Sequence, residues 1–209
     1  MNHNGISNSV IRRLPRYYRF LGDLKAAGMS RISSSELSER MGLTASQIRQ
    51  DLNCFGGFGQ QGYGYNIEML QNEIGQILGL NEPQSAILIG VGNLGRAITQ
   101  HITFETRGFQ LIGLFDNKES LVGQVVRHLP IRSISSLDEF CKENLPKVAI
   151  LCIPKDAAKP LADQLIDLGI KGFWNFSHYD LALHHPGVVV ENMHFGDSLM
   201  TLSYRLHNK

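Results

Sequence analysis

The first 80 residues carry apolar side chains at the spacing of helices. The pattern predicts a helix that begins near Pro15 and ends before Gly28, because proline suits the first helical turn and glycine the position after the last. The apolar positions of this helix are Leu14, Tyr18, Leu21 and Leu24.

Two capping boxes follow this helix. Ser33 and Glu36, and then Thr44 and Gln47, lie three residues apart, so that in each box one residue can bond the backbone amide of the other. Each box predicts the start of a short helix, and Gly42 ends the first of them. Two short helices across a glycine-containing turn predict a helix-turn-helix. The apolar face of the second helix consists of Ile48 and Leu52.

Residues 55–65 are too rich in glycine for a helix, but they contain enough aromatic residues for two short strands around a turn. We interpret this segment as a wing. Asn66 is placed to cap a further helix, and residues 79–83 are typical of a linker. Residues 1–80 therefore predict a winged-helix domain. The apolar positions of its last helix are Ile67, Leu70, Ile74 and Ile77.

From residue 85 onward, short apolar runs alternate with helical stretches. Continuous apolar runs of this length are typical of buried parallel strands, and the alternation predicts an α/β fold with a doubly wound parallel sheet. The runs span residues 86–89, 111–115, 148–153, 173–176 and 188–190.

The composition indicates the class of protein, and the distribution of charged residues differs between the two parts of the chain. The chain has 209 residues, a net charge of +1 and 43% hydrophobic residues, as soluble globular proteins do. We expect a cytoplasmic protein outside membranes, because no run approaches roughly 18 apolar residues and no signal peptide begins the chain. Residues 1–52 hold eight Lys and Arg against four Asp and Glu, whereas residues 81–209 hold twelve against thirteen. This asymmetry is typical of a nucleic-acid-binding module joined to a neutral one.

The cysteines and histidines predict no metal site. The cysteines form no C-x-x-C pair, which argues against disulfides and structural zinc. Three histidines near Pro186 have the spacing of a surface loop, and we expect neither metal binding nor catalysis from them. These residues are Cys54, Cys141, Cys152, His178, His184 and His185.

A glycine motif follows the first apolar strand. Residues 90–95 have the pattern G-x-G-x-x-G, whose glycines permit a tight turn, close approach of the backbone to a pyrophosphate, and close helix packing. Asp116 ends the next strand 21 residues beyond Gly95, where a carboxylate would accept from the adenosine ribose hydroxyls. The combination predicts NAD, and the alternative is a glycine turn needed only for packing. The predicted cofactor residues here are Gly90, Val91, Gly92, Asn93, Leu94, Gly95, Asp116, Asn117 and Lys118.

Two details refine the predicted site. Lys118 could meet the 2′-phosphate of NADP, but Asp116 would repel that group, so NAD is preferred. Residues after two later strands lie at the carboxyl edge of the sheet, where such folds bind ligands, and we predict that they line the nicotinamide side. Strand-end packing is the alternative for each of them. They are Ile153, Pro154, Asn175 and Ser177.

Taken in order, these motifs closely resemble the Rex family of redox-sensing transcriptional repressors, over nearly the whole chain. The resemblance implies a homodimer with an N-terminal winged helix, a Rossmann domain over residues 84–195 and a C-terminal helix, residues 196–209, exchanged between subunits. It implies a repressor rather than an enzyme, which binds an inverted-repeat DNA operator and is released by NADH. The motifs that carry it are Gln47 to Leu52, Phe55 to Tyr65, Gly90 to Gly95, Asn175-Phe176 and Val190-Glu191-Asn192. Against the partner subunit we expect Leu199, Leu202 and Leu206.

On DNA, we expect the second helix of the helix-turn-helix to enter the major groove and the wing to enter the minor groove. The chain departs from the family pattern where Gln50 replaces a lysine and where Gln60 and Gln61 replace basic wing residues, which lowers the phosphate-driven part of affinity. The predicted groove residues are Gln47, Arg49, Gln50 and Asn53, the phosphate contacts Arg13, Arg16 and Ser34, and the minor-groove residues Gln61 and Tyr63.

The family's switch is also altered. Relatives link an arginine, a tyrosine and an aspartate differently in the free and NADH-bound states, and these positions fall at Arg19, His101 and His194. Three potential cations cannot reproduce an Arg–Asp ion pair. By the same resemblance Phe195 packs near the nicotinamide, and with Ile153 and Pro154 it would favour NADH over the cationic NAD⁺.

Two other functions fit parts of the sequence. A small NAD-dependent oxidoreductase would use the same nucleotide motif, but it needs a substrate pocket and an acid or base for which the chain has no second catalytic domain. A regulator that senses another adenine nucleotide, such as coenzyme A, would use the same fold.

Overall fold

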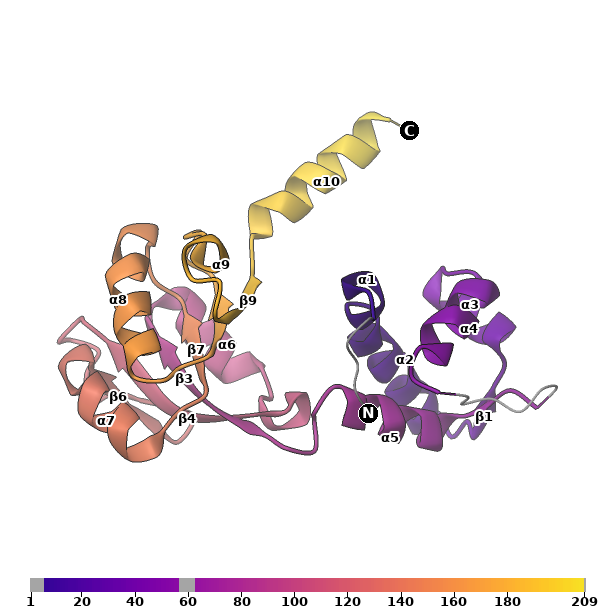
Figure 1. The fold of residues 1–209 in the computed structure, drawn as a ribbon, viewed down its shortest axis with the longest axis horizontal. Coiled ribbons are helices and arrows are strands. Elements are labelled where there is room, and N and C mark those ends of the chain that lie inside the picture. Colours follow the sequence, from indigo (N-terminus) through magenta and orange to yellow (C-terminus); the bar gives the residue numbers. More distant parts are fainter. Residues whose placement is uncertain (1–5, 57–62, 209) are drawn as a thin grey trace. The chain divides into compact units, whose positions relative to one another are not determined.

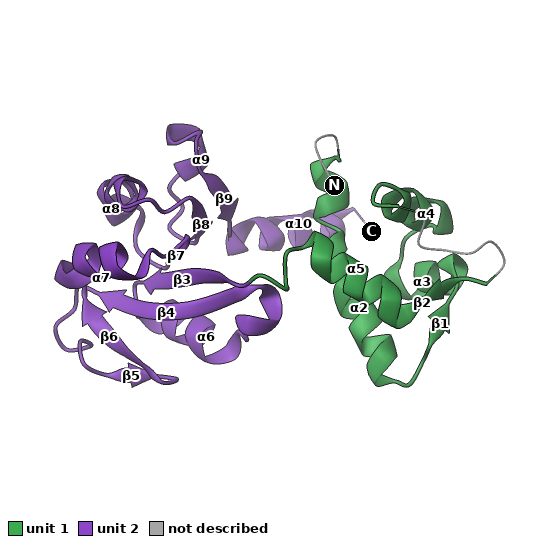
Figure 2. Ribbon diagram, turned by 60° about the horizontal axis from the view of Figure 1, so that its bottom comes forward, with its two compact units in different colours: residues 1–82 green, residues 83–209 purple. Residues whose placement is uncertain are grey.

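The computed structural model describes residues 6–56 and 63–208, which form two compact units, Met1–Glu82 and Pro83–Lys209 (Figure 2). The predicted combination of a helical N-terminal unit with an α/β C-terminal unit is confirmed (Figure 1). The helices of the described residues are all too short or too polar to cross a membrane.

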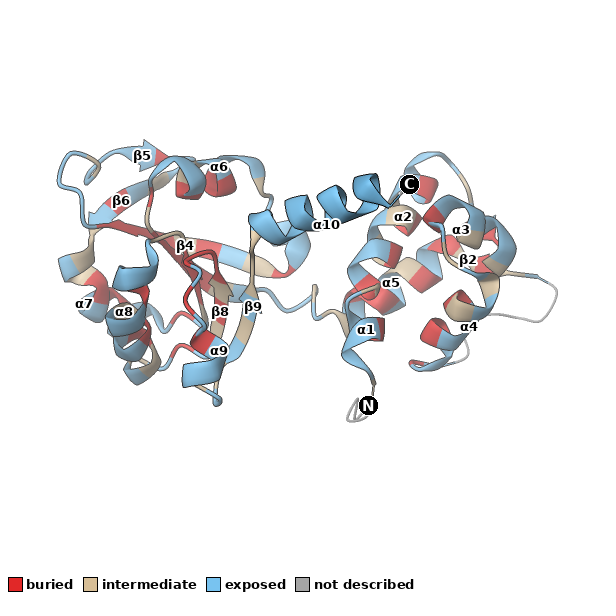
Figure 3. Cartoon of the chain, turned by 90° about the horizontal axis from the view of Figure 1, so that it is seen from above, coloured by how far each residue is buried: buried red, intermediate tan, exposed pale blue. Residues whose placement is uncertain are grey.

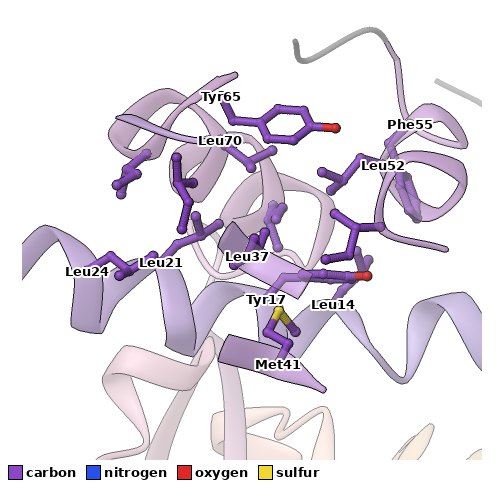
Figure 4. Close-up of a cluster of buried hydrophobic side chains, with 14 of the residues drawn as sticks. Leu14, Tyr17, Leu21, Leu24, Leu37, Met41, Leu52, Phe55, Tyr65 and Leu70 are labelled. Atoms are coloured by element: carbon purple, nitrogen blue, oxygen red, sulfur yellow. The ribbon is translucent and has the colours of Figure 1, made fainter. Parts of the chain in front are cut away.

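The first unit consists of short helices around one apolar core (Figure 4). Both predicted N-caps begin their helices: the Oγ atom of Ser33 accepts from the Glu36 amide, and the Oγ1 atom of Thr44 accepts from the Gln47 amide, at 3.1 Å in each case. The Asn66 side chain caps the next helix as predicted. Its elements are α1 (Asn8–Ile11), α2 (Leu14–Ala26), β1 (Arg31–Ile32), α3 (Ser34–Met41), α4 (Ala45–Asn53), β2 (Tyr65–Asn66) and α5 (Ile67–Ile77).

Three details of this unit differ from the sequence prediction. Tyr17 rather than Tyr18 is the fully buried aromatic residue of α2, because it continues the i, i+3, i+7 spacing from Leu14. The Gln47 side chain does not complete its capping box but donates to Asp51. The strand β2 pairs antiparallel with β1, which precedes the helix-turn-helix and which the sequence pattern did not predict. Gln60 and Gln61 lie outside the described residues.

The second unit is a seven-stranded sheet in the order β5-β6-β4-β3-β7-β8-β9. Its strands are parallel except for β5, which pairs antiparallel with β6 at one edge. The sequence pattern missed β5 and β6, because β5 has two residues and β6 buries one side chain only. The strands are β3 (Gln84–Ile89), β4 (Phe109–Asp116), β5 (Val125–Val126), β6 (Leu129–Ser133), β7 (Val148–Leu151), β8 (Gly172–Asn175) and β9 (Val189–Asn192).

Helices cover both faces of this sheet. One apolar cluster joins the sheet to α6, and the other joins it to α7 and α8 on the opposite face. The last helix, α10, is exposed along its length (Figure 3). The helices are α6 (Asn93–His101), η1 (Glu105–Arg107), η2 (Ile134–Ser136), α7 (Leu137–Asn144), α8 (Lys155–Asp167), α9 (Leu181–His184) and α10 (Phe195–His207).

The complete capping box at the start of α3 gives a test of local stability. Replacing Ser33 by Ala removes the side-chain acceptor for the Glu36 amide, and we expect the free energy of unfolding to fall by about 1 kcal/mol in urea denaturation followed by circular dichroism. Ser35→Ala is the control, because Ser35 is exposed inside the same turn. An equal loss in both variants would contradict a capping role for Ser33.

Candidate functional sites

The glycine motif joins β3 to α6, and its three glycines differ in what a Cβ atom would meet at each position. Gly90 has φ +92°, and a Cβ atom there would lie 2.4 Å from the carbonyl oxygen of Cys152. At Gly95 a Cβ atom would lie 2.0 Å from the carbonyl oxygen of Gly90, so only glycine lets α6 approach the strand this closely. At Gly92 a Cβ atom would meet no protein atom within 4 Å. The first and third glycines therefore serve the fold, and the middle one leaves room beside the loop.

Asp116 holds this loop from the end of β4. Its buried carboxylate accepts from the backbone N–H of Val91 at 2.6 Å and from that of Lys118 at 2.8 Å. Val91 itself is fully buried, so it offers the site its backbone and not its side chain. The side chains of Asn93, Leu94, Asn117 and Lys118 are exposed around this carboxylate. The structure thus brings the two predicted nucleotide segments together.

The strand-end residues Asn175 and Ser177 are buried and bonded to their own chain. The Asn175 amide donates to the Tyr179 carbonyl oxygen and to the Oδ1 atom of Asn192, both at 2.8 Å. Its oxygen accepts from the Ser177 amide at 3.1 Å and from the Ser177 hydroxyl at 2.6 Å. These bonds use the full hydrogen-bonding capacity of an amide side chain. The structure therefore supports the packing alternative for these two side chains, which shape the loop after β8.

The remaining residues of the predicted nicotinamide side are more accessible. Ile153 is half-buried beside Gly90, and Pro154 is the exposed N-cap residue of α8. Phe195 begins α10, is 56% exposed, and has its ring centroid 5.9 Å from that of Phe176. Each could therefore contact a ligand at this edge of the sheet.

Among the three predicted switch residues, His194 contacts a second histidine that the sequence analysis did not predict. Its Nδ1 atom lies 2.9 Å from the Nδ1 atom of His178, and the two rings stack with centroids 4.9 Å apart. His101 is exposed at the end of α6. Arg19 is exposed on α2 in the other unit, where its guanidinium lies 5.9 Å from the Phe20 ring centroid.

The helix-turn-helix presents most of its predicted DNA residues to solvent. Arg49, Gln50 and Asn53 are exposed on α4, and Tyr63 is 71% exposed. Some of the predicted contact residues also form hydrogen bonds within the unit. Arg49 donates to the Oγ atom of Ser34 at 2.9 Å, and Arg16 donates to the carbonyl oxygen of Met41. The predicted residue Gln61 lies outside the described residues.

Asp51, on the buried face of α4, is the residue that sequence reasoning missed. Its carboxylate is 1% exposed and accepts from Arg13 Nε at 2.6 Å and from Arg13 Nη2, Tyr17 Oη and Gln47 Nε2, each at 2.8 Å. Burial raises the pKa of Asp51, but the hydrogen bonds from Arg13, Tyr17 and Gln47 outweigh it and leave the pKa below its ordinary value. The signal in the sequence was a carboxylate between Ile48 and Leu52 on an apolar face.

Comparison with known proteins agrees with this geometry. Residues 5–53 match the family model described as "Putative DNA-binding protein N-terminus", and residues 81–179 match the "CoA binding domain". A redox-sensing transcriptional repressor Rex from Caldanaerobacter subterraneus subsp. tengcongensis is 53% identical over 98% of this chain and 91% of its own length. The chain belongs to the Rex family. The Rex of Clostridioides difficile is 50% identical over 98% of this chain and 97% of its own.

Solved structures of Rex-type chains have the same fold. The crystal structure of RSP in complex with beta-NAD+ and operator DNA matches with a TM-score of 0.90 and 51% identity, over 97% of this chain and 93% of that one. RSP in complex with beta-NADH matches with a TM-score of 0.88 and 48% identity, over 98% and 95% of the two chains. The predicted family and its two-part α/β fold are therefore confirmed.

The steric roles of Gly95 and Gly92 can be separated by one substitution at each of these two positions. Gly95→Ala places a methyl group against the Gly90 carbonyl, and we expect a loss of about 1–3 kcal/mol from overpacking. Gly92→Ala meets no atom and should leave the free energy of unfolding unchanged. Urea denaturation of both variants measures the difference, and equal stability would refute the close approach at Gly95.

Proposed function

We propose that this chain is a homodimeric transcriptional repressor that binds an inverted-repeat operator through its first unit and releases it when NADH occupies its second. The observation that carries the proposal is the glycine loop held by Asp116 in a chain whose other unit is a helix-turn-helix. Chains of about 50% identity in complex with beta-NAD+ and operator DNA, and with beta-NADH, support it.

The residues at the glycine loop fit a dinucleotide. The space at Gly92 admits a pyrophosphate, and the N-terminus of α6 supplies amide donors and positive dipole to it. Asp116 would exchange its bonds to the loop for the adenosine ribose hydroxyls, with Asn117 and Lys118 exposed beside it. Its negative charge disfavours the 2′-phosphate of NADP, so the proposed cofactors are NADH and NAD⁺.

In this proposal, the residues on the nicotinamide side distinguish NADH from NAD⁺. Ile153, Pro154 and Phe195 offer apolar surface, and burying the neutral ring of NADH there costs less than burying the cationic ring of NAD⁺. Asn175 and Ser177 act on this side by shaping the loop after β8 rather than by contacting the cofactor. NADH can shift the dimer away from the DNA-binding form only as far as it binds the two forms differently.

We propose a regulator rather than an enzyme, acting in the cytoplasm where its DNA target lies. The near-full-length relatives are named repressors. The buried polar side chains at the strand ends are committed to their own loop, so the proposal assigns no residue to proton transfer. Coenzyme A is retained as a test ligand because the match to the "CoA binding domain" covers the second unit.

The decisive experiment uses an inverted-repeat duplex that the chain itself selects from a randomised pool. Binding is measured at one fixed salt concentration with no ligand, NAD⁺, NADH or coenzyme A, because affinity for DNA depends steeply on salt. We expect release by NADH and retention with the other ligands. Release by coenzyme A alone would replace NADH as the ligand, and retention with all of them would overturn ligand control.

Asp116→Ala provides the matched variant for this assay. We expect it to bind the duplex as the wild-type chain does when ligand is absent, since Asp116 lies in the second unit, and to need at least tenfold more NADH for release. Isothermal titration of NADH measures the same loss directly. Unchanged NADH affinity would exclude Asp116 from the ribose site.

The second unit leaves apolar surface for another copy of the chain. Leu199, Leu202 and Leu206 are 52–66% exposed along α10. On the α6 side of the sheet lies a hollow of about 380 Å³. Among the residues that line it are Ile102, Phe104, Val148, Ile150, Trp174 and Val189. We propose that α10 and the rest of residues 196–209 are exchanged between subunits to cover such surface, because exposed apolar patches of this kind mark interfaces.

A charge placed on either side of α10 tests this exchange. Leu202→Arg should convert the dimer to monomers in sedimentation velocity, because it buries an unpaired charge in the interface. Thr201→Arg adds the same charge to the polar side of the helix and should leave the dimer intact. The opposite order of effects would place the interface on the other face of α10.

A further inference from the structure

The carboxylate of Asp51 joins the helix-turn-helix to the start of α2 through four donated hydrogen bonds. One oxygen accepts from Arg13 Nη2 and Gln47 Nε2, and the other accepts from Arg13 Nε and Tyr17 Oη. A carboxylate has about four lone-pair sites, so its capacity is filled. The partners come from two elements, since Arg13 is the N-cap residue of α2, Tyr17 lies inside α2, and Gln47 lies in the first turn of α4.

An ionised carboxylate accepts hydrogen bonds and never donates them. The amide of Gln47 must therefore turn its NH₂ end towards Asp51, which leaves its oxygen on the other side. Gln47 is half-buried, and the first residues of a recognition helix are those that reach base edges in the major groove. Asp51 thus decides which end of the Gln47 amide faces a base.

We propose that Asp51 is a positioning residue for operator specificity, acting through Gln47 and Arg13. The inference rests on the proposed DNA-binding function. With its orientation fixed, Gln47 matches adenine, which offers the N7 acceptor and the N6 donor. Guanine offers two acceptors, N7 and O6, and meeting both would require the amide hydrogen that Asp51 holds. The buried carboxylate therefore favours adenine over guanine at one base pair in each half-site.

Arg13 gives the same carboxylate a second effect on DNA binding. Its guanidinium makes a two-pronged bond to Asp51, and its side chain is 26% exposed. Asp51 compensates its charge, so the partly exposed guanidinium of Arg13 does not act as a free cation. Asp51 thereby lowers the affinity for DNA irrespective of its sequence, while it increases the discrimination between sequences.

The test variant is Asp51→Asn, which keeps the shape of the side chain and removes its charge. Asparagine can offer an NH₂ group to the Gln47 oxygen, so the Gln47 amide is no longer held in one orientation. We expect discrimination between adenine and guanine at one base pair to fall by at least about fivefold, the low end for a bidentate contact. We also expect the salt dependence of binding to an unrelated duplex to steepen by about 0.9 in log–log slope, one extra phosphate contact from Arg13.

Tyr17→Phe is the matched control. It removes one hydrogen bond from the same carboxylate but leaves the bonds from Gln47 and Arg13 in place, and the fully buried ring stays in the core. A merely structural role for the cluster would move the two variants together in stability and in affinity for all duplexes. The proposal requires that Tyr17→Phe lose stability and keep the base preference of the wild-type chain.

The measurement compares each variant on the selected duplex, on duplexes with every single base-pair change, and on an unrelated duplex. Unchanged discrimination in Asp51→Asn, or an equal loss in Tyr17→Phe, would overturn the inference.

If Asp51→Asn does not fold, Gln47→Glu carries the test. Its carboxylate cannot donate to Asp51, so the adenine preference must disappear at the same base pair, and its persistence would refute the proposal. A wild-type chain that does not prefer the selected duplex over the unrelated one contradicts the proposed function itself.

Discussion

A buried carboxylate that accepts hydrogen bonds from separate segments is the constraint on which each candidate site depends. In the first unit Asp51 receives side-chain donors from α2 and α4. In the second unit Asp116 receives backbone donors from the glycine loop and from the turn after β4. A buried charge is costly unless its partners stay in place, so each carboxylate fixes the geometry of the groups around it. The two carboxylates differ in what they hold, side chains in one case and a loop in the other.

This difference bears on what each site can do. The donors to Asp116 are amides that a ligand's own hydroxyls can free, so the bond at the loop is exchangeable on binding. The donors to Asp51 are parts of a closed cluster around the core residue Tyr17, and exchanging them would expose a filled interior. The geometry therefore suits Asp116 to respond to a ligand. It suits Asp51 to keep the proposed DNA-contacting side chains in a fixed orientation.

Much of this arrangement follows from the sequence because it rests on local rules. Periodicity and caps predict α2 to α5, and the spacing of Gly90, Gly95 and Asp116 predicts the nucleotide loop, since each depends on neighbours along the chain. What sequence reasoning missed depends on contacts between distant segments. The pairing of β1 with β2, the bond from Arg13 to Asp51 and the contact of His178 with His194 join residues between 16 and 38 positions apart. Neither charge nor periodicity specifies such partners.

A short series of contacts connects the loop after β8 to the start of the exposed helix α10. Asn175 and Ser177 fix the loop after β8, and His178 in that loop contacts His194. His194 is the N-cap residue of α10 and makes no side-chain cap bond, because its Nδ1 atom faces His178. Phe195 follows as the first helical residue, beside Phe176. The proposed nicotinamide contact and the proposed exchanged helix are thus one backbone step apart. A shift of Phe195 on ligand binding would therefore move the start of the helix that we propose to be exchanged.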